Sequence, residues 1–103
     1  KNHPHYVASK AALVGYTRAS AMELAPRNIL VNAIAPGLID TPLLRNLTPE
    51  RMAAQLALQP TGKAGRPEDV AHAVSFLVSA QTDFITGQVI FVDGGKSLGG
   101  SGA

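Results

Sequence analysis

Two kinds of apolar pattern alternate along this chain of 103 residues. In residues 5–25, small and apolar side chains recur at helical spacing with no proline before Pro26, which predicts a long helix. Apolar positions cover most of its circumference, so we expect this helix to be buried on several sides. Residues 66–80 also show helical spacing, with Pro67 at the first position and two acidic residues in the first turn, and they predict a second long helix.

Two short apolar runs predict β-strands. Residues 29–35 are almost continuously apolar and stop at Pro36 and Gly37, and residues 88–92 stop at an Asp-Gly-Gly turn. Such runs are typical of strands that are covered on both faces, as in parallel sheets. A strand, a crossover helix and a second strand in this order predict a parallel pair. Two strands alone leave an unpaired sheet edge, so we expect further strands outside this chain.

The segment between the first strand and the second long helix, residues 38–66, contains three prolines. Within it, Thr48 followed by Pro49 predicts the start of one short helix. A connection of this length is often a binding loop, and we expect residues 41–60 to form a substrate loop or lid. The small, glycine-rich residues 96–103 predict a flexible tail.

Composition places the chain among globular proteins. Apolar residues make up 46% and charged residues 16% of the sequence, which argues against disorder. The net charge is +2 and the nine basic residues are scattered, so the pattern does not favour nucleic-acid binding. No apolar run reaches the length of a membrane span, so no membrane partner is expected. The absence of cysteine excludes disulfides and fits a cytoplasmic protein.

Tyr6 and Lys10 are the first candidates for chemistry. A step of four residues along a helix turns by about 400°, which leaves the two side chains about 40° apart on one face. A nearby ammonium group favours the ionised phenolate, which suits the phenol to give or take a proton near neutral pH. The alternative is a surface pair without function, because this spacing occurs often by chance.

Four segments, in this order, resemble the short-chain dehydrogenase/reductase family of NAD(P)-dependent oxidoreductases. They are YVASKAAL, RNILVNAIAPGLIDTP, GRPEDVAHAVSFLVS and ITGQVIFVDGG, and they lie within residues 6–95. The resemblance implies an α/β fold, the C-terminal part of a Rossmann-like doubly wound parallel sheet with two strands, two long helices and one short loop helix. On this basis, residues 1–95 form the C-terminal half of an NAD(P)-binding domain.

The resemblance also implies roles for particular residues. Tyr6 would be the catalytic acid/base, which exchanges a proton with the carbonyl or hydroxyl oxygen of a small-molecule substrate. Lys10 would hold the ribose hydroxyls of the cofactor and make the phenol easier to ionise. Both residues are therefore expected in the catalytic and in the cofactor-binding set.

Four further residues after the first strand are implied as cofactor-binding. Pro36 and Gly37 would form the cofactor loop, the backbone of Ile39 would meet the nicotinamide carboxamide, and Thr41 would bond the cofactor's amide or pyrophosphate. This position agrees with the rule that ligands of open parallel sheets bind beyond the carboxyl ends of the strands. The simpler alternatives are a plain strand end at Pro36-Gly37 and a turn cap at Thr41.

Several parts of such an enzyme have no counterpart in these residues. They are the glycine-rich turn for the pyrophosphate, the residue that selects NAD or NADP, and the upstream catalytic serine. The chain also begins with Lys1 rather than methionine, so we expect a piece of a longer protein, the alternative being a removed tag or initiator residue. We therefore expect the chain alone to be inactive, with NAD or NADP as the cofactor of the complete enzyme.

Partners and alternatives follow from the same resemblance. Expected partners are a carbonyl or alcohol substrate, and either a complementing N-terminal half or further copies of this chain in a homo-oligomer. A 3-oxoacyl group, a sugar or polyol, and a steroid all remain open as substrates. The alternative function is a non-catalytic, self-associating interaction module, and a third interpretation is a proteolytic or crystallised remnant. His3, His5 and His72 lack the spacing of metal ligands, so no metal site is expected.

Overall fold

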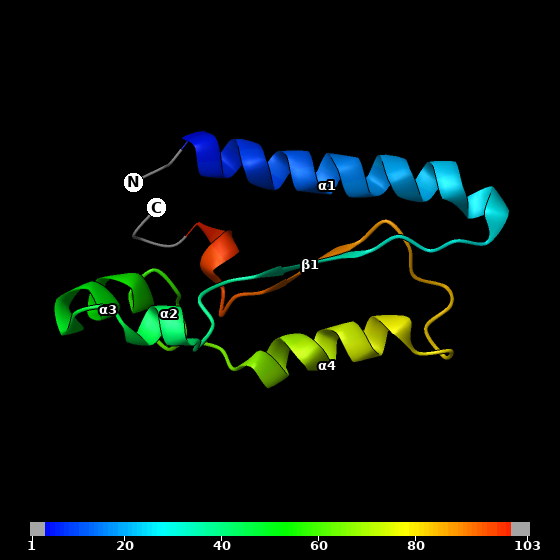
Figure 1. Ribbon diagram of the computed structural model, residues 1–103. Helices are drawn as coiled ribbons and strands as arrows, with labels where there is room; N and C mark the ends of the chain where they lie inside the picture. Colours follow the sequence, from blue (N-terminus) through cyan, green and yellow to red (C-terminus); the bar gives the residue numbers. More distant parts are fainter. Residues whose placement is uncertain (1–3, 100–103) are drawn as a thin grey trace.

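The computed structural model describes residues 4–99 of the protein as an open arrangement of helices around a short sheet (Figure 1). The elements are, in chain order, α1 (Pro4–Leu24), η1 (Ala25–Arg27), β1 (Ala33–Pro36), α2 (Pro42–Arg45), α3 (Pro49–Leu56), α4 (Pro67–Val78), β2 (Val89–Val92) and η2 (Lys96–Leu98). The 3₁₀ helices are η1 and η2. In Figure 1, α1 and α4 lie on opposite sides of the strands, and α2, α3 and η2 gather at one end.

The two strands are parallel, and their residues pair in register from Ala33 with Val89 to Pro36 with Val92. The predicted α/β fold with two parallel strands and two long helices is confirmed, and it is consistent with part of a Rossmann-like sheet. The long loop differs in one respect, because it carries two helices instead of one. The additional helix α2 is a single turn that begins at a proline, a residue whose fixed φ favours the first helical position.

The first strand is shorter than its apolar sequence predicts. Of the run that begins at residue 29, only Ala33–Pro36 joins the ladder. Immediately before it, the Asn32 side chain donates to the Ile85 carbonyl (3.0 Å) and accepts from the Gln88 N–H (3.0 Å). A side-chain amide thus satisfies backbone groups that a longer ladder would pair.

Helix α1 is more exposed than we expected. Within residues 4–99, only Thr17 and Ala21 of this helix are buried, whereas Tyr16 is 75% and Met22 80% exposed. Its less exposed positions form a single stripe, which consists of residues 10, 13, 14, 17, 20, 21 and 24. The expectation of burial on several sides is therefore wrong for residues 4–99, because the rest of the described chain covers only one face of α1.

The predicted short helix in the loop is confirmed as α3, and the loop is closed at its base. The Thr48 hydroxyl caps α3 by accepting from the Arg51 N–H (3.2 Å). At the base, the side chain of Gln59 is 2% exposed and accepts from the Leu38 N–H (2.5 Å), while it donates to the Lys63 carbonyl (2.7 Å). The buried amide of Gln59 therefore connects Lys63, near the end of the loop, to Leu38, which follows β1.

Helix α4 begins with a cap in which the Asp69 carboxylate accepts hydrogen bonds from Arg66. The Arg66 N–H donates to Asp69 Oδ2 (2.7 Å), and the Arg66 guanidinium donates to Asp69 Oδ1 (2.9 Å). Hydrogen bonds from the Arg66 side chain and backbone lower the pKa of the Asp69 carboxyl from 3.8 to about 2. The same contacts raise the pKa of the Arg66 guanidinium. The charged form of this cap is therefore the stabilising one.

This cap makes a pH-dependent contribution to stability. A carboxyl whose pKa is lower in the folded than in the unfolded chain stabilises the fold above the unfolded value and stops doing so as the pH falls through the folded value. Replacing Asp69 with asparagine should therefore lower the free energy of unfolding near neutral pH, and the difference should close between pH 3.8 and about 2. Urea unfolding at several pH values measures this, with Asp83→Asn in an exposed loop as control. A difference independent of pH would contradict the assignment.

The predicted tail from residue 96 begins with an ordered turn. Lys96–Leu98 form the 3₁₀ helix η2, and Gly95 before it has the left-handed φ of +90° that favours glycine. Residues 100–103 of the predicted tail lie outside the described residues. Within residues 4–99, no helix combines the length and apolar character needed to cross a membrane.

Candidate active site

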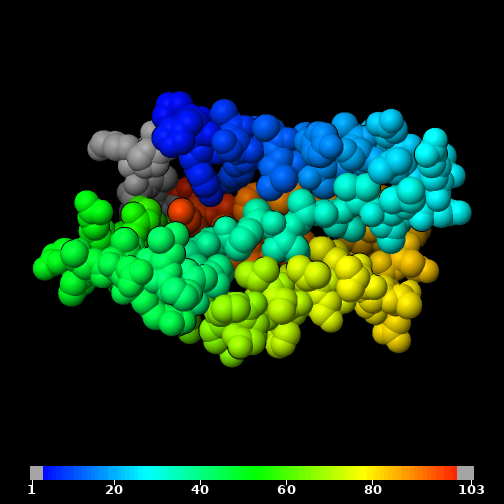
Figure 2. Space-filling model, viewed as in Figure 1, coloured from blue at the N-terminus to red at the C-terminus, as the bar shows by residue number. Residues whose placement is uncertain are grey.

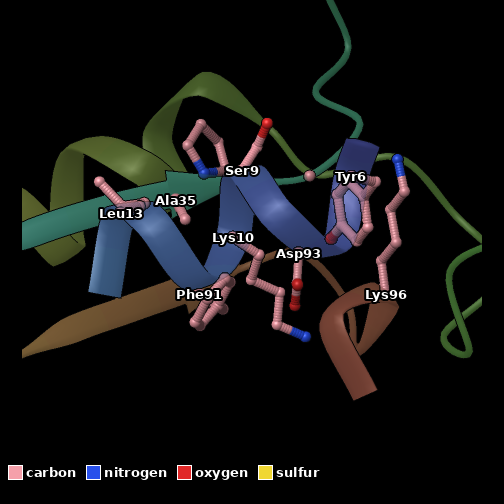
Figure 3. A pocket seen from close by; sticks show the side chains of 10 residues that line it. Tyr6, Ser9, Lys10, Leu13, Ala35, Phe91, Asp93 and Lys96 are labelled. Atoms are coloured by element: carbon pink, nitrogen blue, oxygen red, sulfur yellow. The ribbon is translucent and has the colours of Figure 1, made fainter. Parts of the chain in front are cut away.

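Tyr6 and Lys10 lie in the first turns of α1 and face a hollow of about 200 Å³ at the carboxyl ends of both strands (Figure 3). Helical spacing brings their side chains to the same wall, as the sequence predicts. The opposite wall consists of the end of β1, the end of β2 and η2. The lining residues are Tyr6, Ser9, Lys10, Leu13, Ala35, Pro36, Gly37, Phe91, Asp93 and Lys96.

The phenol and the two lysines of this hollow are arranged around η2. Lys10 Nζ donates to the Ser97 carbonyl and lies 5.5 Å from the centroid of the Phe91 ring. Lys96 Nζ lies 5.8 Å from the centroid of the Tyr6 ring. Tyr6 and Lys10 thus share the hollow without a hydrogen bond between them within residues 4–99. Figure 2 shows the red surface of η2 recessed between the blue start of α1 and the chain that follows β1.

Gly37 is needed at the end of β1 because the chain approaches itself closely there. Its N–H donates to the Val92 carbonyl (3.0 Å). A Cβ atom at this position would lie 2.7 Å from Asp93 Cβ and 2.8 Å from Asp93 Cα, and it would also overlap the Gln59 side chain. Gly37 is therefore the residue at which the end of β1, the end of β2 and the base of the loop meet.

Asp93 organises the side of the hollow formed by η2. Its carboxylate is buried and accepts from the Gly95 N–H (3.0 Å) and the Ser97 N–H (2.8 Å). These bonds hold η2 in the position where Ser97 meets Lys10. Sequence reasoning treated Asp93 only as part of a strand stop and missed Lys96. The available signal was an acid directly after a strand, followed by two glycines, which can begin an Asx-type turn by accepting from the N–H two residues later.

The remaining predicted site residues line a second, larger hollow. Ile39 and Thr41 border a space of about 660 Å³, whose walls are mostly apolar and include Leu43, Leu44 and Leu47. Gly37 lines both hollows, so it joins the two groups of predicted residues. Thr41 stands at the cap position of α2, but its side chain makes no capping hydrogen bond. Its hydroxyl is therefore not used as a turn cap.

The backbone N–H and C=O of Ile39 point away from Gly65. It pairs with Gly65 in an isolated parallel bridge, in which the Gly65 N–H donates to Leu38 (2.9 Å) and the Asp40 N–H donates to Gly65 (2.7 Å). In such a bridge, the N–H and C=O of the central residue point to the opposite side. Within residues 4–99, neither group of Ile39 has a backbone partner, so both can serve a ligand.

Metal ligands do not gather near these hollows. Within the described part of the chain, no group of three histidine, cysteine, aspartate or glutamate residues could hold a metal ion. His3 lies outside the described residues, and His72 borders a shallow depression on α4 far along the sequence from Tyr6. The hydrogen-bond donors around the two hollows include a phenol, two hydroxyls, two ammonium groups and a guanidinium.

The chain is similar in sequence to known proteins over nearly all of its length. Residues 1–97 match the family model described as "Enoyl-(Acyl carrier protein) reductase". The chain is 47% identical over 91 residues to a 3-oxoacyl-[acyl-carrier-protein] reductase of Thermotoga maritima, which covers 88% of this chain and 37% of that protein. It is 42% identical over 94 residues to the enzyme of the same name from Vibrio cholerae, covering 91% and 38%.

A third relative has a different name. The chain is 47% identical over 93 residues to the (2S)-[(R)-hydroxy(phenyl)methyl]succinyl-CoA dehydrogenase subunit of Thauera aromatica, covering 90% of this chain and 38% of that protein. The chain therefore spans less than two fifths of the length of each of these relatives. The family match over nearly all its residues nevertheless shows that the chain belongs to the short-chain dehydrogenase/reductase family.

Proposed function

We propose that this chain supplies the acid/base and one wall of the cofactor site of an NAD(P)-dependent oxidoreductase, which transfers hydride between the nicotinamide and a carbonyl or alcohol substrate. The observation that carries the proposal is the position of Tyr6 and Lys10 in one hollow at the carboxyl ends of both strands. Ligands of open α/β sheets bind at this edge.

Tyr6 would donate its phenolic proton to the carbonyl oxygen during reduction and accept the proton during oxidation. The cofactor, when bound, supplies or accepts the hydride. The Lys10 ammonium lies on the next turn of α1 and would stabilise the negative charge that the phenol carries after donation. An ammonium has three N–H donors, so Lys10 can keep its bond to Ser97 and still donate to a ribose hydroxyl.

The residues after β1 fit the amide end of a nicotinamide. A carboxamide carries an acceptor and a donor, and the backbone of Ile39 offers a donor and an acceptor on its exposed side. The Thr41 hydroxyl is not consumed as a cap and lies along the same hollow. Pro36-Gly37 would bring this segment close to the ring, because glycine allows the chain to pass Asp93 at short range.

The substrate class that we propose is an acyl thioester with an oxo or hydroxyl group. The names of two relatives describe acyl groups carried by acyl carrier protein, and that of the third describes an acyl group on CoA. The larger hollow beside Thr41 is lined by leucines and suits an acyl chain. This observation favours a 3-oxoacyl group over a sugar or polyol.

The proposal is tested with the purified chain and with a chimera. In the chimera, residues 1–97 replace the matching segment of the Thermotoga maritima reductase, and NADH and NADPH oxidation is followed with a 3-oxoacyl thioester. We expect turnover by the chimera and none by the chain alone, because hydride transfer needs a positioned nicotinamide. A chimera that unfolds cooperatively on heating but shows no turnover would contradict the proposed function.

Exposed apolar side chains give some support to the alternative of a self-associating module. Tyr16 and Met22 on α1, and Val78 at the end of α4, are each at least 75% exposed. Sedimentation of the purified chain, combined with the activity assay of the chimera, distinguishes the enzyme from the self-associating module. Self-association of the chain and an inactive, folded chimera would favour the module, whereas an active chimera favours the enzyme.

A further inference from the structure

Lys96 is a second cation at the Tyr6 site. It is the first residue of η2, and its stem runs alongside the Tyr6 ring in Figure 3. Its Nζ lies 5.8 Å from the ring centroid, within the range of a cation–π contact. The side chain is half-buried and lines the same hollow as Tyr6 and Lys10.

The two lysines of this hollow differ in their partners. Lys10 donates to the Ser97 carbonyl, whereas Lys96 Nζ has neither a hydrogen bond nor an ion pair with any group within residues 4–99. An ammonium group without an acceptor in the chain is an incomplete interaction, because each of its N–H groups can still donate to a ligand. A ligand that enters the hollow can complete it.

The nearby carboxylate does not cancel this positive charge by direct contact. Asp93 is buried, and its two oxygens accept from the amides of Gly95 and Ser97 instead of from either ammonium. The hollow therefore presents two ammonium groups beside a phenol, and it favours an anionic group over a neutral one. The backbone that carries Lys96 is held in place because Asp93 accepts from the N–H groups on both sides of it.

We propose that Lys96 is a specificity residue, which binds an anionic group, a carboxylate or a phosphate, of the ligand that lies beside Tyr6. This inference rests on the proposed function for the position of the ligand. The anion has two sources, a carboxylate on the acyl group of the substrate or a phosphate of the dinucleotide. The relative from Thauera aromatica is named for a succinyl-CoA derivative, whose acyl group carries such a carboxylate.

The kinetic test uses the chimera with two substrates that differ in one charge. These are the N-acetylcysteamine thioesters of 3-oxohexanoic acid, which is uncharged, and of 3-oxohexanedioic acid, in which a carboxylate replaces the terminal methyl group. For Lys96→Met we expect KM for the ligand that supplies the anion to rise about ten-fold, as for loss of a hydrogen bond to a charged group, with little change in kcat. Lys96→Arg should restore KM, and Lys63→Met, an exposed lysine outside this hollow, should leave it unchanged.

The pattern of KM values identifies which ligand supplies the anionic group. A rise confined to the dicarboxylate thioester supports a substrate carboxylate, and a rise confined to NADH or NADPH supports a cofactor phosphate. If Lys96→Met leaves KM for both thioesters and both dinucleotides within two-fold, the proposal is wrong.

A binding measurement keeps this test separate from the proposed function. The purified chain is titrated with succinate and with inorganic phosphate while the ring signals of Tyr6 are followed by NMR, with Tyr6→Phe used for their assignment. A shift that saturates and is lost in Lys96→Met supports anion binding at Lys96, even if the chimera proves inactive and the proposed function fails. Two outcomes overturn the inference. One is an active chimera in which Lys96→Met leaves every KM unchanged. The other is an inactive chimera together with a purified chain in which no shift of the Tyr6 signals depends on Lys96.

Discussion

Replacing Tyr6 with phenylalanine in the chimeric enzyme is expected to lower kcat about 10²- to 10⁴-fold, the range that general acid/base catalysis supplies. The ring remains and still packs beside Lys96, but the proton donor is removed. Because the hydroxyl acts mainly on the transferring proton, KM for the nucleotide should change much less than kcat, even though Tyr6 also borders the expected cofactor site. Steady-state rates with NADH or NADPH and a 3-oxoacyl thioester measure both quantities.

The matched control is the other tyrosine of the same helix. Tyr16 is 75% exposed and lines neither of the two hollows described above, so Tyr16→Phe should leave kcat unchanged. Both variants remove one hydroxyl from α1, which separates an effect on chemistry from an effect on helix stability. A Tyr6→Phe chimera with near-normal kcat would exclude Tyr6 as the acid/base and would leave the proposed function without its central residue.

Replacing Gly37 with alanine is expected to lower the free energy of unfolding by about 1–3 kcal/mol, the usual cost of overpacking a close contact. The added methyl would sit 2.7 Å from Asp93 Cβ, and backbone on that side cannot rotate away as a long side chain could. It would also press on Gln59, whose buried amide closes the base of the loop. Urea unfolding of the purified chain, followed by circular dichroism, measures the change.

The control for this substitution has the opposite expected sign. Gly15 lies within α1, and a Cβ there would meet nothing within 4 Å. Gly15→Ala should therefore raise the free energy of unfolding by about 0.5–1 kcal/mol, since alanine loses less conformational freedom than glycine in a helix. If Gly37→Ala has the same free energy of unfolding as the unchanged chain, the contact between Gly37 and Asp93 has room for a methyl group, and the expectation is wrong.

Local signals in the sequence were sufficient for most of the elements. Helical spacing and the prolines at positions 26, 49 and 67 place α1, α3 and α4 close to their observed bounds. The apolar runs and their Pro-Gly and Gly-Gly ends place both strands, although the first strand begins four residues later than the pattern suggests. These features depend on residues a few positions apart, which a single sequence displays directly.

The shared face of Tyr6 and Lys10 could also be predicted, because it follows from helix geometry alone. The family resemblance added the prediction that the segment after β1, residues 36–41, binds the cofactor. The bond from Lys10 to Ser97, the approach of Lys96 to Tyr6, and the contact of Gly37 with Asp93 could not be predicted. Each joins residues more than fifty positions apart, and no local pattern records which distant backbone lies opposite a side chain.

By itself, the sequence thus determined the order of helices and strands, the parallel pair and the face of α1 that carries the phenol and the ammonium. Only the tertiary structure decided how little of α1 is covered, which residues η2 brings to Tyr6 and Lys10, and why position 37 has no room for a side chain. The reason is that periodicity reports the direction of a side chain from its own backbone, whereas burial and pairing depend on chain segments that only folding brings together.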